Sequence, residues 1–439
     1  MRAEREGWAS LYKSEDWWAI WIGFFLLAFS AIGVIEAVPK LPSWEWPSVS
    51  GSIPSTVIPS LLLLAAFLSL LFAAANFLMG KPHSLRFIPA FFVIFVLSVL
   101  AFAISGEKIA KTYGIGDAFW AVAIGLAISN TFGTPEWLRP AIRTEFYIKT
   151  GLVLLGAEIL FNRILEFGLY GLAIAWGVTP IVIIFMWHFG NRVLKMVNKP
   201  LIITIAASTS VCGVSAAIAA AAACKAKKED LTIAVGMTLI FTVFMMVLMP
   251  PFIQAVGMSE LVGGAWMGGT IDSTGAVAAA GAFLGPEAEA SAVIVKMIQN
   301  ILIGLVAFAI ALYWVTSIER NPGAPRPGLA EVWYRMPKFI LGFIGASLIA
   351  SFVLMPLMGA DGVDAMTDLS KEFRGWLFCL AFLSIGLESN FKEMGQHMTG
   401  GKPMLLYIGG QTFNLVLTLL VAWLVLSGII FPAPPPLAH

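Results

Sequence analysis

Charged residues and cysteines are both scarce in this chain of 439 residues. Only 12% of the residues are charged, and the formal net charge at pH 7 is +1. Nucleic-acid-binding proteins carry an excess of Lys and Arg, so we expect no nucleic-acid partner. The three cysteines, Cys212, Cys224 and Cys379, stand in apolar segments without CxxC spacing. Their arrangement excludes a disulfide framework and favours neither a zinc site nor any other metal site.

Residues typical of enzymes are also few. The four histidines, His83, His188, His397 and His439, lie at segment ends or in loops, which argues against a haem or a His-ligated metal. No G-x-S-x-G elbow, H-E-x-x-H pair or P-loop occurs. We therefore predict that the protein is not an enzyme and has no resident cofactor. Cys212 is the only nucleophile that a membrane enzyme could plausibly use.

Apolar sequence is abundant, at 59% of the residues. About thirteen windows are long enough to span a bilayer. They lie near residues 17–37, 57–78, 87–105, 115–130, 146–161, 169–189, 201–223, 231–249, 262–284, 290–315, 339–357, 376–388 and 404–426. With the N-terminus inside, sixteen Lys and Arg residues fall on the inner side and nine on the outer side, so we predict a cytoplasmic N-terminus.

Two lysines inside apolar windows indicate an internal repeat. Lys149 stands in FGTPEWLRPAIRTEFYIKTGLVLLG and Lys296 in LGPEAEASAVIVKMIQNILIG, so a turn with Pro and Glu precedes each lysine. The offset of five helices is odd, which inverts one half relative to the other. We predict an all-α membrane protein with three peripheral helices and two inverted five-helix repeats. The corresponding divisions are 1–113, 114–256, 257–428 and a proline-rich tail at 429–439.

Two segments combine polar residues with small ones. TIAASTSVCGVSAAIAAAAA covers residues 204–223, and GGTIDSTGAVAAAGAFLG covers 268–285. Unsatisfied polar groups are costly in hydrocarbon, so we expect a broken helix at each segment and a binding site nearby. Close packing of ordinary helices is the alternative, but Asp272 favours function. The repeat register pairs the first segment instead with Gly386 and Glu388, and we expect both polar segments to meet at the centre.

The candidate substrate site follows from these features. Two ammonium groups near hydroxyls and helix N-termini suit an anion, although each lysine could instead reach the interface or form an ion pair with Glu158 or Asp272. The predicted substrate-binding residues are Lys149, Lys296, Ser208, Thr209, Ser210, Cys212, Gly213, Ser215, Thr270, Ser273, Thr274, Gly275 and Asn300.

Three carboxylates are candidates for coupling transport to an ion. Asp272, Glu158 and Glu388 could each carry a proton or help to coordinate sodium, because a carboxylate removed from water needs a compensating cation. Glu158 and Glu388 could instead mark helix ends at the membrane interface. The coupling ion, Na⁺ or H⁺, therefore stays open.

At AASTSVCGVSAAIAAAAA, GGTIDSTGAVAAAG, AVIVKMIQN and KTGLVLLG, the chain resembles the YeiH-type family of bacterial inner-membrane proteins, described as sulfate exporters. The resemblance covers roughly residues 116–426. It implies a place among the inverted-repeat secondary transporters that include bile-acid and sodium/proton transporters, with two crossed broken helices and elevator-type movement. It also implies a location in the bacterial inner membrane and a possible homodimer.

The sequence departs from that family at the second polar segment. Many members have GTVHEVAQVVAAG where this chain has GTIDSTGAVAAAG, so Asp272 and Ser273 replace His and Glu, and Ala276 replaces Gln. Gln299 stands where an Arg is often found. We predict a secondary transporter that moves a small anion, sulfate or a related sulfur oxyanion, by alternating access. A sodium- or proton-coupled organic-acid transporter and an anion channel are the alternatives.

Overall fold

The chain is a nearly all-helical membrane protein. The computed structural model describes residues 10–33, 37–48, 51–81, 84–108, 110, 116–159, 161–318, 333, 337–391, 401–429, 431, 432 and 437. Eight helices in these ranges are long and apolar enough to cross a membrane. The thirteen-span layout and the inverted repeats remain predictions. The N-terminal tail at 1–9, His83, His397, His439 and most of the proline-rich tail lie outside the described residues.

Two compact units divide the chain. Unit 1 comprises Met1–Arg5, Leu165–Pro337 and Phe391–His439, and unit 2 comprises Glu6–Ile164 and Lys338–Asn390. The units follow spatial contacts, whereas the predicted domains follow the order of the chain. The division into repeats is therefore neither supported nor contradicted by the two units.

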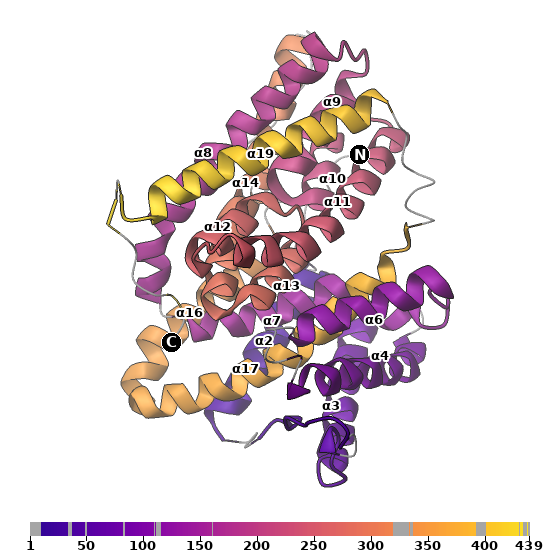
Figure 1. The fold of residues 1–439 in the computed structure, drawn as a ribbon, viewed down its shortest axis with the longest axis vertical. Coiled ribbons are helices and arrows are strands. Elements are labelled where there is room, and N and C mark those ends of the chain that lie inside the picture. The colour runs from indigo at the N-terminus through magenta and orange to yellow at the C-terminus, as the bar shows by residue number, and fades with distance from the viewer. Residues whose placement is uncertain are drawn as a thin grey trace. The chain divides into compact units, whose positions relative to one another are not determined.

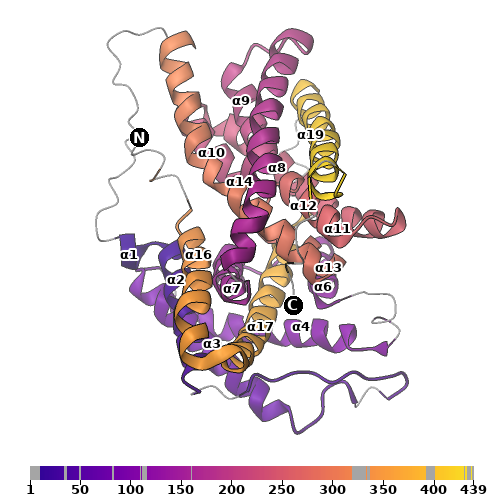
Figure 2. The ribbon, with the colours of Figure 1, turned by 90° about the vertical axis from the view of Figure 1, so that its left-hand side faces the viewer.

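Unit 2 contains helices from two stretches that are far apart in the chain. Figure 2 shows α16 beside α2, two helices that are more than 300 residues apart in the chain but in contact. Most of these residues are apolar, but burial differs between the helices: α7 (Thr144–Glu158) buries 12 of its 15 residues, whereas α3 (Ile58–Leu78) buries 9 of its 21. Its helices are α1 (Ser10–Lys13), α2 (Glu15–Ala31), α3 (Ile58–Leu78), α4 (Ser84–Ser105), α6 (Asp117–Thr131), η2 (Arg139–Ala141), α7 (Thr144–Glu158), α16 (Phe339–Ile349), η6 (Ala350–Leu354) and α17 (Met355–Glu388).

Helices α6 and α17 cross at two glycines. A Cβ atom at Gly125 would lie 2.8 Å from the Cα atom of Gly386, so neither position has room for a side chain. Beyond the crossing, Asn130 Nδ2 donates to Ser389 O at 2.9 Å, and Asn390 Nδ2 donates to Ser129 O at 2.7 Å. Each helix thus has a Ser-Asn pair at its end, and the asparagine of each pair donates a hydrogen bond to the serine carbonyl of the other.

Unit 1 contains the two polar segments found in the sequence. Figure 1 shows α12, α13 and α14 grouped together, with α9, α10 and α11 nearby and α19 extending past α12. Its helices are α8 (Phe161–His188, in unit 1 from Leu165), η3 (Phe189–Val193), α9 (Lys199–Ala207), η4 (Ser208–Cys212), α10 (Gly213–Cys224), α11 (Lys228–Ala255), α12 (Glu260–Thr270), α13 (Thr274–Leu284), α14 (Pro286–Tyr313), η5 (Trp314–Ile318) and α19 (Lys402–Leu426).

Both polar segments are interrupted helices. The first turns from α9 through the π-helical η4 into α10 at Gly213, whose φ of 25° and ψ of −110° lie outside the helical region. The second leaves helical geometry at Ile271 and starts again after Ser273, both of which are extended. Gly213 is needed at the first break because a Cβ atom there would lie 2.8 Å from the carbonyl oxygen of Asp272 in the second. The two breaks are therefore in contact.

The glycine crossing in unit 2 provides a stability test. We expect Gly386→Ala to destabilise the protein by about 1 to 3 kcal/mol, because the new methyl group meets backbone atoms of α6 that cannot rotate away. Gly375→Ala on the same helix is the matched control: nothing lies within 4 Å of its Cβ position, and Ala is the better helix former by up to about 1 kcal/mol. Thermal unfolding of the purified variants measures both. Equal melting temperatures for the two variants would contradict the crossing.

Candidate functional site

Three neighbouring residues of α14 form the polar centre of unit 1. Lys296, Gln299 and Asn300 are 1%, 2% and 1% exposed. Their spacing of three and four residues places them on one face of the helix. This face of a largely apolar helix of 28 residues thus presents an ammonium group and two amides to the interior of its own unit.

Lys296 and Gln299 bind carbonyl groups that the helix breaks leave without helical partners. Lys296 Nζ donates to Val211 O at 2.8 Å and to Gln299 Oε1 at 2.6 Å. Gln299 Nε2 donates to Ser210 O at 3.0 Å and to Gly269 O at 3.2 Å. The last turn of a helix lacks intrahelical donors for its carbonyls. One lysine and one glutamine therefore satisfy the C-terminal ends of the half-helices on both segments.

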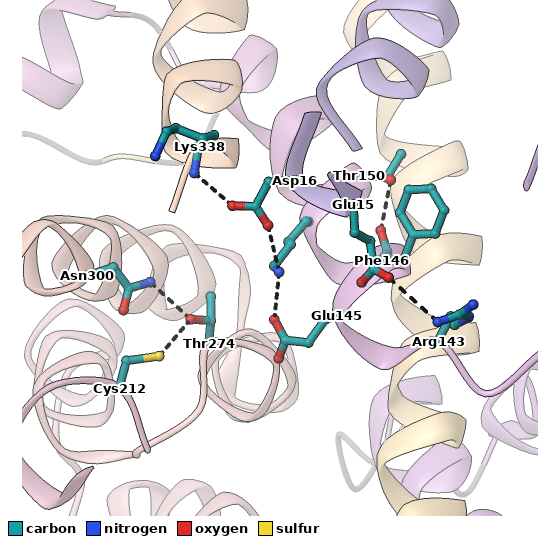
Figure 3. Close-up of polar contacts among 11 residues, drawn as sticks. Glu15, Asp16, Arg143, Glu145, Phe146, Thr150, Cys212, Thr274, Asn300 and Lys338 are labelled. Carbon is teal, nitrogen blue, oxygen red and sulfur yellow. Dashed lines mark hydrogen bonds and ion pairs between the residues drawn. The ribbon is translucent and has the colours of Figure 1, made fainter. Parts of the chain in front are cut away.

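Asn300 lies where the second half-helices begin. Its Nδ2 donates to Thr274 Oγ1 at 3.0 Å, and the Cys212 Sγ lies 3.7 Å from the same hydroxyl. Figure 3 shows Asn300 and Cys212 approaching Thr274 from two sides. Cys212 precedes α10 and Thr274 opens α13, so the positive N-terminal ends of two helices converge here. The Oδ1 atom of Asn300 is buried and has no hydrogen-bond partner among the described residues.

The second break also carries a buried carboxylate. Asp272 is 2% exposed and accepts a hydrogen bond from the Tyr407 hydroxyl of α19. One turn further along α19, Gln411 Nε2 donates to Thr270 O at 2.9 Å. Asn414 Nδ2 donates to Thr209 O at 3.2 Å. A stripe of polar residues on α19 thus holds both interrupted segments.

The hydroxyls predicted to bind substrate mostly bond within their own helices. Ser208 and Thr209 donate to Ile205 O, Ser210 to Ala206 O, and Thr270 to Trp266 O, at 2.6 to 2.9 Å. Such local bonds satisfy a hydroxyl inside an apolar protein. Of the other predicted residues, Ser215 is exposed, Ser273 is half-buried, and Gly213 and Gly275 are buried. Their roles in binding stay predictions.

Lys149, the second predicted lysine, lies in unit 2 and is already paired. Its Nζ lies 2.9 Å from Asp16 Oδ1 and 3.4 Å from Glu145 Oε2. The other oxygen of Asp16 accepts from the backbone nitrogen of Lys338 at 2.7 Å, just before α16 begins. Figure 3 shows Asp16 beside Lys338. This group of charges joins α2, α7 and α16.

The carboxylates Glu158 and Glu388 also lie in unit 2. Glu158 receives two parallel bonds from Arg374, at 2.9 Å from Nε and 3.0 Å from Nη2, the bidentate geometry that strengthens such pairs. Glu388 ends α17 on an exposed position and accepts from Thr144 Oγ1 at 2.9 Å. Their predicted coupling roles are untested, as is the pairing of Glu388 with the first polar segment.

Several residues at this centre were missed or left out of the predicted site. Gln299, Tyr407, Gln411 and Asn414 all bond directly to the interrupted segments. A signal for three of them was present, because Tyr407, Gln411, Asn414 and Thr418 recur at helical spacing within an otherwise apolar helix. In the described part of the chain, no group of three His, Cys, Asp or Glu residues could hold a metal.

Comparisons with known proteins place the chain among membrane proteins. A family model described as Conserved hypothetical protein 698 matches residues 89–407. The chain is 55% identical over 372 residues to UPF0324 membrane protein RB9488 of Rhodopirellula baltica, covering 84% of this chain and 68% of that one. A UPF0324 membrane protein of Nitratidesulfovibrio vulgaris is 50% identical over 385 residues, with 86% and 66% covered.

A more distant relative matches over nearly its full length. UPF0324 membrane protein NE0724 of Nitrosomonas europaea is 29% identical over 494 residues, covering 98% of this chain and 100% of that one. The chain spans about two thirds of the first two relatives. No solved structure matches.

The ion pair of Lys149 can be tested by a double-mutant cycle. We expect Lys149→Met and Asp16→Asn each to lower the melting temperature. The double variant should lose less than the sum, with a coupling of about 0.5 to 3 kcal/mol, because the two charges compensate each other in a mostly buried place. Additive losses would show that the pair does not hold α2 to α7. Lys40→Met serves as a comparison, since Lys40 forms an exposed pair with Glu372 that should contribute little.

Proposed function

The chain belongs to the UPF0324 family of membrane proteins, and within that family we propose that it is a secondary transporter of a small oxyanion whose substrate binds in unit 1 at Lys296. This assignment keeps the anion predicted from the sequence and moves its centre to one lysine. The environment of Lys296 carries the proposal.

Lys296 is a buried cation that interacts electrostatically with Asp272 but forms no ion pair in the described part of the chain. Its two hydrogen bonds go to neutral oxygens, those of Val211 and Gln299. Among the described residues, no carboxylate lies within ion-pair distance of its Nζ. An isolated ammonium in a low-dielectric interior is unfavourable by several kcal/mol, roughly, unless an anion compensates it. A bound anion would supply that compensation.

The ends of α10 and α13 suit the same ligand. A helix N-terminus offers backbone N–H groups and a partial positive charge, and two such ends meet at Cys212 and Thr274. The unpartnered oxygen of Asn300 leaves a hydrogen-bonding position beside them. Because Asn300 is one turn along α14 from Lys296, an anion bound between them would contact both the ammonium and the helix ends.

A small tetrahedral oxyanion fits this donor set best. Lysine acts as a point charge and does not select planar carboxylates as arginine does, and backbone N–H groups bind oxyanions of several shapes. We place sulfate or a related sulfur oxyanion first, moved by alternating access and exported from the cell. We also propose that the protein lies in a bacterial inner membrane with its N-terminus in the cytoplasm. In this proposal it can form a homodimer and has no enzymatic activity.

Lys149 takes a different role in this proposal. Because Asp16 and Glu145 already compensate its charge, we propose that it holds helices together and does not bind substrate. We propose the same structural role for Glu158, which is paired with Arg374.

The test is uptake of labelled sulfate into proteoliposomes that contain the full chain. We expect Lys296→Met to lower uptake at least about tenfold, because it removes a charged hydrogen-bond donor from the site. Lys149→Met is the matched control, an identical change in the other unit, and should retain uptake per folded molecule. Uptake by the unmodified chain should saturate with sulfate concentration.

The outcomes separate the alternatives. Full activity of Lys296→Met would refute the assigned site, and uptake that rises without saturation would indicate a channel. If Lys296→Met fails to fold, Asn300→Ala replaces it, with the sulfate-dependent rise in melting temperature as the measurement. A rise with organic acids but not with sulfate would favour the organic-acid alternative.

A further inference from the structure

Asp272 belongs to a ring of oxygen-bearing side chains that the anion site does not use. Tyr407 donates to Asp272, and one turn along α19 the Gln411 amide contacts Met245 Sδ of α11 at 2.8 Å. Thr242 and Thr238 lie one and two turns before Met245 on that helix. We call Asp272, Tyr407, Gln411, Thr242 and Thr238 the oxygen ring.

Two members of the oxygen ring, Thr238 and Asp272, lie next to each other at the first helix break. A Cβ atom at Gly213 would lie 2.7 Å from Thr238 Cγ2 and 2.8 Å from the carbonyl oxygen of Asp272, so Thr238 and Asp272 are neighbours across this glycine. The Tyr407 ring also stacks on Phe241 of α11 at 4.7 Å. The ring's members thus come from α11, α19 and the break between α12 and α13, all in unit 1.

The ring contains buried oxygens that lack hydrogen bonds. Gln411 Oε1 and Thr242 Oγ1 are buried and have no partner in the part of the chain that the structure describes. The residues are 5% and 4% exposed. A buried polar atom without a partner is unfavourable. Both atoms are of the kind that coordinates hard cations.

Asp272 adds a negative charge to these neutral oxygens. It is buried, and within the described residues it forms no ion pair, not even with Lys296. Lys296 and Asp272 of unit 1 are therefore two buried groups of opposite charge that interact electrostatically without forming an ion pair. Without an ion pair, each still favours a ligand of opposite charge.

We propose that the oxygen ring binds a small monovalent cation of the sodium type, through the Asp272 carboxylate and the oxygens of Gln411, Thr242 and Thr238. One carboxylate matches one positive charge, and coupling ions in membrane carriers bind beside interrupted helices. A divalent ion would retain an uncompensated charge. That this cation drives anion movement rests on the proposed function, but its binding does not.

Cation binding is tested on the purified full chain by thermal unfolding without sulfate. Sodium chloride replaces choline chloride at constant ionic strength, and potassium chloride serves as the second salt. We expect a saturable rise in melting temperature with sodium that is larger than with potassium. In Thr242→Val and Gln411→Leu, the sodium concentration that gives half of the rise should increase about tenfold.

Matched variants keep the test interpretable. Thr204→Val removes a buried hydroxyl of the same unit whose partners, Pro200 O and Cys224 Sγ, lie outside the oxygen ring. This variant should leave the sodium response unchanged. Thr242→Ser retains the hydroxyl, so its melting temperature should still rise with sodium. If Thr242→Val does not fold, Thr242→Ser and Gln411→Leu provide the comparison. Equal stabilisation by sodium, potassium and choline would overturn the proposal, as would an unchanged response in Thr242→Val and Gln411→Leu.

The result is separable from that of sulfate uptake. A sodium response without sulfate uptake would support the cation site and refute the transport assignment. Sulfate uptake without a sodium response would do the reverse, and an effect of pH in place of sodium would identify a proton as the occupant and overturn the sodium site.

Discussion

Two helices are interrupted inside unit 1, and the backbone N–H and C=O groups left without helical partners there determine which polar side chains surround them. An interrupted helix leaves carbonyls without donors at one end and N–H groups without acceptors at the other. In hydrocarbon no water replaces the missing partners. Lys296 and Gln299 of α14 bind the carbonyl ends, and α19 contributes Gln411 and Asn414 to the same segments. The breaks therefore require polar residues on both neighbouring helices.

The buried charges fall into two classes with different consequences. Lys149 with Asp16 and Glu158 with Arg374 are compensated within unit 2, and each pair joins helices that are distant in the sequence. Lys296 and Asp272 in unit 1 interact electrostatically but form no ion pair within the described residues. Charges of the first class stabilise a fold. Charges of the second class favour ligands of opposite charge, and for that reason we place the proposed substrate and the proposed cation in unit 1.

Much of the helical layout could be predicted from apolar windows, because length and hydropathy are local properties. Most described helices overlap a predicted window, but α17 also runs through residues 358–375, which were predicted to lie between two windows. Both polar segments are interrupted where Ser, Thr and Gly gather. The candidate site was harder to predict. Lys149 and Lys296 look alike in sequence, and the partner that distinguishes them, Asp16, is 133 residues from Lys149. The polar stripe of α19 was visible as a period, but its contacts were not.

The sequence by itself determined that this is a helical membrane protein with two polar interruptions, two lysines within apolar windows and one aspartate beside a break. These properties depend on residues that are near one another in the chain. The tertiary structure decided which lysine is neutralised, that Gln299 binds both half-helices, and that Asp272 lies with oxygens of α11 and α19. Those outcomes depend on packing between distant helices, because a charge is compensated by whatever the fold brings within a few ångströms, roughly, of it.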